Sequence, residues 1–183
     1  MNIENLKELL RNRPYMAGVE RTKTRTKSSG EVFTPTPLVQ EIMDQLVAND
    51  PTFFDDYSST FLDPSCGDGQ FLSEVMIRKM ENGSTFEQAL GTIYGVDLMA
   101  DNVKLCQDRL LCGQEHLRHI VQRNIVEADG LRYHYRFDGT DPYLSDKDLA
   151  LKNQGFDFGD TPKAPKIKKT NPVKEPISNP LFS

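Results

Sequence analysis

A short apolar run followed by an acid, two glycines and a helix is the feature that most constrains the fold of this chain. It spans residues 61–72, FLDPSCGDGQFL. Phe61 and Leu62 are typical of the end of a buried strand, and the apolar spacing after Gly69 predicts a helix that packs back onto that strand. Gly67 and Gly69 lack a Cβ, so the turn can adopt positive φ and bring bare N–H groups against a ligand. The stretch therefore predicts a strand, turn and helix that bind a cofactor.

A dinucleotide is not the ligand that this turn favours. The third glycine of the G-x-G-x-x-G fingerprint is missing, because Leu72 takes its place. The next acid at a strand end is Asp97, in the segment 92–97, and it lies farther along the chain than the roughly 20 residues that the fingerprint expects. An adenosine ligand without a pyrophosphate fits this spacing better.

The string DPSCGDGQFL resembles the D-P-x-C-G-x-G-x-F-L motif of S-adenosylmethionine-dependent DNA methyltransferases that modify the adenine amino group. The segment GEVFTP at 30–35 resembles a second signature of that family, which includes type I and type IIG restriction-modification enzymes. The resemblance implies an α/β fold with a Rossmann-like methyltransferase sheet and S-adenosyl-L-methionine as cofactor. It disfavours RNA or protein as the substrate, because both motifs belong to the DNA family.

The same resemblance implies which residues bind the cofactor. An F-T-P segment would lie against the methionine end, Asp97 would accept both ribose hydroxyls, and Asp129 in the third strand unit, 124–131, would bind the adenine amino group. A helix N-cap is the alternative role for Asp97. The full set is Phe33, Thr34, Pro35, Asp63, Pro64, Cys66, Gly67, Gly69, Phe71, Asp97, Leu98, Asp129 and Leu131.

Apolar spacing predicts the helices around this centre. One follows the F-T-P segment, with Thr36 as N-cap, Pro37 in the first turn, and Leu38, Ile42 and Leu46 on its apolar face. A short amphipathic helix at residues 3–10 is stopped by a proline. Further helices follow the first two strands, the earlier one ending at an Asn-Gly pair and the later one striped by Val103, Cys106 and Leu110.

Past residue 131 the strand signals weaken. Leu131, Tyr133, Tyr135 and Phe137 alternate like one exposed strand, and residues 155–159 are a candidate for another. Few β-branched residues follow, too few for further buried parallel strands, so the sheet is expected to hold only its cofactor-binding half. We therefore divide the chain into an N-terminal helix and basic arm (1–29), a methyltransferase cofactor-binding domain (30–160) and an extended tail rich in lysine and proline (161–183).

The catalytic N-P-P-[FYW] loop of the resembled family is absent. In that family the Asn side chain and a Pro carbonyl accept the amino hydrogens of the target, and the aromatic ring stacks on the flipped base. The nearest match is Asn179-Pro180-Leu181-Phe182, which makes Asn179, Pro180 and Phe182 the candidate catalytic residues. A shorter match is DPY at 141–143. The alternative interpretations are an extended tail and a turn.

Two functions remain open at this point. The first is methylation of the N6 of adenine in DNA. The second is a catalytically degenerate or split relative that binds the cofactor and serves as a partner subunit or sensor, which the missing loop and the lack of a target-recognition domain favour. If residues 132–183 supply no strands, the strand that ends at Asp63 is an exposed edge, so we expect a homodimer or a complementing polypeptide.

The charge of −5 is unevenly distributed. Residues 28–160 hold 23 acidic and 10 basic residues, whereas residues 21–27 hold four basic residues and 161–176 hold five lysines and one acid. Such basic arms can neutralise phosphates, so weak DNA binding is expected through them. Solubilising disorder is the alternative.

Cysteines and hydropathy bear on the cellular setting. Cys66, Cys106 and Cys112 are odd in number and lack C-x-x-C spacing, which favours reduced thiols over disulfides or zinc. His116 and His119 have no accompanying ligand pattern, so no metal site is predicted. No apolar run reaches the roughly 20 residues of a membrane span, and residues 1–10 do not follow a signal-peptide plan. A cytoplasmic protein without a membrane partner is expected.

Overall fold

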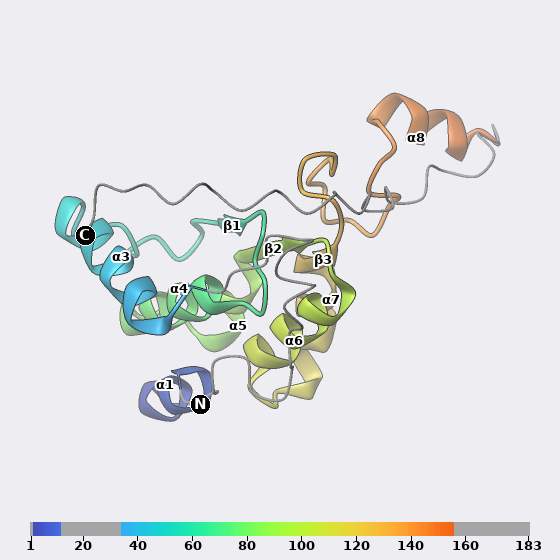
Figure 1. The fold of residues 1–183 in the computed structure, drawn as a ribbon. Coiled ribbons are helices and arrows are strands. Elements are labelled where there is room, and N and C mark those ends of the chain that lie inside the picture. Colours follow the sequence, from blue (N-terminus) through green and yellow to red (C-terminus); the bar gives the residue numbers. More distant parts are fainter. Residues whose placement is uncertain (1, 12–33, 156–183) are drawn as a thin grey trace, which may run out of the picture.

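The computed structural model describes residues 2–11 and 34–155. Helices and strands alternate over most of this range, as the sequence predicts, around a small parallel sheet (Figure 1). The elements are α1 (Ile3–Arg11), α3 (Thr36–Asn49), β1 (Phe61–Asp63), α4 (Gln70–Glu81), α5 (Phe86–Gly91), β2 (Ile93–Asp97), α6 (Ala100–Leu111), the 3₁₀ turn η1 (Glu115–Leu117), α7 (Arg118–Asn124), β3 (Ile125–Glu127) and α8 (Asp146–Asn153).

Within the described residues the sheet has three parallel strands in the order β1-β2-β3. Phe61 lies beside Ile93, and Gly95 lies beside Ile125. All three strands therefore end at the same edge of the sheet, and a connecting segment follows each strand there. In parallel sheets this edge is where ligands bind. The chain is a mixed α/β protein with a small sheet of this kind.

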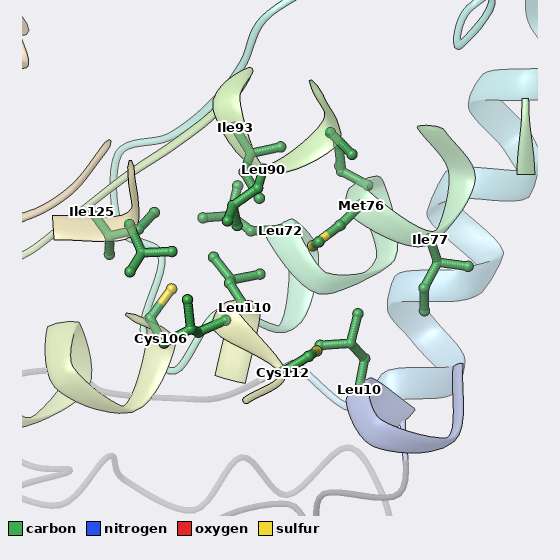
Figure 2. Close-up of a cluster of buried hydrophobic side chains, with 14 of the residues drawn as sticks. Leu10, Leu72, Met76, Ile77, Leu90, Ile93, Cys106, Leu110, Cys112 and Ile125 are labelled. Carbon is green, nitrogen blue, oxygen red and sulfur yellow. The ribbon is translucent and has the colours of Figure 1, made fainter. Parts of the chain in front are cut away.

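The main core lies between one face of the sheet and helices α4, α5, α6 and α7. Figure 2 shows Leu72 and Met76 of α4 packed with Ile93 and Ile125 from the strands and Leu110 from α6. Among residues 2–11 and 34–155, few side chains cover the other face of the sheet. Leu62 belongs to that face beside Tyr94 and is 48% exposed, so the prediction of a buried strand end is wrong for this residue.

An aromatic segment, not a strand, covers part of the second face. Tyr133 packs with Val96 and Ala128, and the ring of Phe137 lies 4.8 Å from that of Tyr94. The predicted strand over 131–137 is wrong: Tyr135 and Phe137 have φ of 53° and 52°, which no strand allows. The predicted strand at 155–159 lies outside the described residues, apart from a turn at its first residue.

The buried face of α3 is displaced from the predicted one, although Ile42 and Leu46 are half-buried and Leu46 packs against the core. Val39 and Met43 are buried, whereas Leu38 is 46% exposed. Apolar residues occur in adjacent pairs along this helix, so its periodicity alone allowed either stripe, and packing against α4 decided between them. The N-cap is Pro35 rather than Thr36, because the helix begins one residue earlier than predicted.

Helices α1, α4 and α6 follow the predictions closely. Helix α1 buries Leu6 and Leu10 against α4, and α6 buries the predicted stripe of Val103, Cys106 and Leu110. Helix α4 ends just before Asn82 and Gly83. Helices α5, α7 and α8 are not among the predicted helices. No helix in 2–11 or 34–155 is long and apolar enough to cross a membrane.

Candidate functional site

A cavity of about 980 Å³ lies where the three strands end. Its walls come from the turn after β1, the ends of β2 and β3, Thr34 just before α3, Met43 within α3, the first two turns of α4 and the start of α6. Such a volume suits a nucleoside-sized ligand. The predicted cofactor-binding residues that line it are Thr34, Asp63, Pro64, Cys66, Gly67, Phe71, Asp97, Leu98, Asp129 and Leu131.

The glycine turn has the backbone geometry predicted for it. Gly67 has a φ of 53° and lines the cavity, and Gly69 has a φ of 87° and is the N-cap of α4. A Cβ on Gly69 would lie 2.7 Å from the Sγ of Cys106. Gly69 thus lets α6 approach the turn rather than forming part of the cavity wall. Pro35 is likewise not part of that wall.

Asp97 joins two of the turns at the cavity. One carboxylate oxygen accepts a hydrogen bond from the backbone N–H of Gly67 at 3.0 Å. The other accepts from the N–H of Met99 at 2.8 Å and from Nδ2 of Asn102 at 3.0 Å. Met99, not Asp97, is the N-cap of α6. Each carboxylate oxygen has two lone pairs, so Asp97 keeps acceptor capacity for a ligand.

Asp63 ends β1 on the wall of the same cavity. Burial raises the pKa of its carboxyl group, and the nearby Asp97 carboxylate raises it further, against a hydrogen bond from the Ser65 N–H that lowers it. Two neighbouring carboxylates with part of their hydration removed favour a positively charged ligand group.

The turn after β3 completes the wall. The Asp129 carboxylate accepts a hydrogen bond from the N–H of Leu131, and the Asp129 N–H donates to the Tyr143 hydroxyl. Leu131 is 98% exposed. A Cβ on Gly130 would lie 2.6 Å from the carbonyl oxygen of Pro64. Gly130 is therefore needed where the turns after β1 and β3 meet.

Several residues at the site were not predicted from the sequence. Asp68 lines the cavity, and its carboxylate accepts a hydrogen bond from the Arg109 guanidinium at 2.7 Å, with both side chains buried. Gln70 and Asn102 also line it and are buried. Asp68 and Gln70 occupy variable positions of the resembled motif, and Asn102 has no signal beyond its place in the first turn of a helix.

The candidate catalytic residues are not part of this geometry. Asn179, Pro180 and Phe182 lie outside the described residues, as do Phe33 and the basic arm at 21–27. The shorter match at 141–143 forms a turn, in which the Asp141 carboxylate accepts from the Tyr143 N–H.

Comparison with known proteins identifies the family. The profile of the N-6 DNA methylases matches residues 19–140. The chain belongs to the N-6 DNA methylase family. No curated protein and no solved structure matches it significantly. The match runs from the basic arm through the F-T-P segment and the glycine turn of this N-6 DNA methylase to the segment beyond Asp129, so it confirms the family indicated by the two motifs.

Proposed function

We propose that this N-6 DNA methylase binds S-adenosyl-L-methionine in the cavity at the strand ends and methylates the N6 of adenine in DNA. The observation that carries the proposal is the meeting of Asp63, Asp97 and Asp129, which lie at or just after the ends of three adjacent parallel strands, around one cavity with a glycine turn. The sheet would be the cofactor-binding half of a Rossmann-like methyltransferase sheet.

Each acid has a distinct role in this proposal. Asp97, already held by the N–H groups of two turns, accepts the ribose hydroxyls. Asp129 accepts the adenine amino group, and the Phe33-Thr34-Pro35 segment lies against the methionine. The charge of Asp63 complements the positive sulfonium. The cofactor supplies an electrophilic methyl group; the chain orients it and excludes water.

The target adenine requires groups that accept its amino hydrogens and a ring that stacks on it. Asn179, Pro180 and Phe182, in the nearest match to the family's catalytic loop, would take these roles if the chain acts alone, and the N-P-P-[FYW] loop of a partner would take them otherwise. DNA would bind weakly through the basic arms, since the cavity wall itself is acidic.

A second candidate function is a cofactor-binding partner subunit that has no methyl transfer of its own. Two observations favour it. No N-P-P-[FYW] segment occurs in the sequence, and β1 lies at the edge of the described part of the sheet. Both candidate functions require the same cofactor site.

Calorimetric titration with S-adenosylmethionine and with S-adenosylhomocysteine tests that site. We expect both ligands to bind, and Asp97→Ala to weaken binding by about 1.5 to 3 kcal/mol, because hydrogen bonds to a charged group are lost. Glu127→Ala is the matched control, since Glu127 is an exposed acid at a strand end that does not line the cavity. No binding at millimolar ligand would contradict the proposal.

A further inference from the structure

The side chain of Gln70, the first residue of α4, has an unused hydrogen-bond donor at the cavity. Gln70 lines the cavity and is only 8% exposed. Its Oε1 accepts a hydrogen bond from the Thr36 hydroxyl at 3.2 Å, whereas its buried Nε2 has no partner in the described part of the chain. A buried amide donor is costly to leave unsatisfied, so a ligand in the cavity is the natural source of its acceptor.

Two helices begin at this contact. Thr36 is the first residue of α3 and Gln70 is the first residue of α4, and these helices have 14 and 12 residues. Neither has a side-chain N-cap hydrogen bond or an acidic residue in its first turn. The dipoles of both helices and the N-terminal N–H groups of α4 therefore favour a negative charge near Gln70. In α3 the first turn contributes less, because Pro37 has no N–H and Leu38 donates to the Pro35 carbonyl.

The remainder of the cavity wall disfavours an anion. Asp63, Asp97 and Asp129 all line it, and Asp68 is engaged by Arg109. S-adenosylmethionine carries two positive groups, the sulfonium and the ammonium, and one carboxylate. The acidic walls suit the cations, so the carboxylate belongs where the donors are.

We propose that Nε2 of Gln70 donates a hydrogen bond to the α-carboxylate of the cofactor's methionine, at an anion subsite at the start of α4, where Thr36 of α3 contacts Gln70. The inference rests on the proposed function, which it deepens. Gln70 is a binding residue, and Thr36 is a positioning residue, because its hydroxyl holds Oε1 and so directs Nε2 away from itself.

The test compares two ligands that share the nucleoside and the sulfur. S-adenosylhomocysteine carries the amino-acid group, and 5′-methylthioadenosine lacks it. We expect Gln70→Met, which keeps the length of the side chain, to weaken S-adenosylhomocysteine binding roughly 10- to 100-fold and to leave methylthioadenosine binding within about twofold. Gln70→Glu should weaken the first ligand at least as strongly, because two carboxylates would face each other. Gln45→Met, at an exposed glutamine of α3, is the control.

The outcomes separate this inference from the proposed function. If wild-type protein binds neither ligand, both fall. If Gln70→Met weakens both ligands equally, or neither, only the anion subsite is overturned. Tighter binding of S-adenosylhomocysteine to Gln70→Glu would also overturn it, because the side chain would then be accepting from the ammonium. Thr36→Val, which leaves Gln70 in place, should show the same ligand selectivity to a smaller degree, and this variant serves if Gln70→Met does not fold.

Discussion

At the scale of single residues, the cavity without a ligand is an environment that disfavours the charged form of a carboxyl group. Asp63 is the clearest case, because burial and the Asp97 carboxylate both raise the pKa of its carboxyl group. The charge of a cationic ligand group would offset both effects, because it favours the ionised form of the carboxyl group. The acidic residues that lower the stability of the protein without a ligand are thus the residues that would attract the positive groups of the cofactor.

The pH dependence of the free energy of unfolding should reveal this unfavourable environment of Asp63. Since the folded state holds the Asp63 proton more tightly than the unfolded state, the free energy of unfolding falls as pH rises from the unfolded pKa, about 4, through the folded pKa. Asp63→Asn removes the charge and keeps the oxygen that accepts from Ser65. We expect a higher thermal midpoint than wild type at pH 7 and a shrinking difference as the pH falls towards 4.

Asp55→Asn provides the comparison for that experiment, because Asp55 is exposed and lies outside the cavity. Its midpoint should follow that of wild type at every pH. A lower midpoint for Asp63→Asn at pH 7, or a difference that is independent of pH, would contradict the account of the acidic wall.

At the scale of elements, one buried ion pair ties the glycine turn to α6. Asp68 and Arg109 are 6% and 4% exposed, and the two bonded atoms lie 2.7 Å apart. Gly69, beside Asp68, allows the close approach of α6 that this pair needs. The shape of the turn therefore depends on α6, which comes after α4, α5 and β2 in the chain.

Arg109→Met should destabilise the protein by about 3 to 5 kcal/mol, because it leaves the Asp68 carboxylate buried without its guanidinium partner. Adding Asp68→Asn should recover part of that loss, which urea unfolding of the single and double variants would measure. Lys104→Met, in the exposed pair with Asp108 on the same helix, should change stability by no more than about 1 kcal/mol. Strict additivity of the Arg109 and Asp68 changes would rule out the coupling.

At the scale of the whole molecule, β1 lies at the edge of the described part of the sheet. Among the described residues β1 is paired with β2 alone, and Leu62 is exposed on the thinly covered face. An apolar edge strand of this kind invites pairing with another chain. A homodimer or a complementing polypeptide would cover it.

We expect purified protein to form a dimer or to bind such a partner, and methyl transfer to appear only when the partner supplies an N-P-P-[FYW] loop. Light scattering measures the first part, and transfer of a tritiated methyl group to DNA measures the second. A monomer that methylates adenine unaided would contradict both parts, and would make Asn179, Pro180 and Phe182 the working catalytic residues.

The sequence by itself determined those features that depend on neighbours along the chain. The glycine turn, the strands before it and at 93–97, and the acids at the strand ends all follow from short patterns, since a turn with positive φ or a strand end is specified by a few adjacent residues. The same patterns were enough to indicate the family.

Only the tertiary structure decided which distant segments meet. Val39 and Met43 of α3 are buried because of packing against other elements, and the alternating aromatic residues after Leu131 form an irregular segment that covers part of the sheet. The contacts of Thr36 with Gln70 and of Asp68 with Arg109 likewise join distant parts of the chain. Each outcome depends on shape and charge complementarity between surfaces far apart in the chain. Periodicity shows that a face is apolar, but the neighbour that covers it is set by packing.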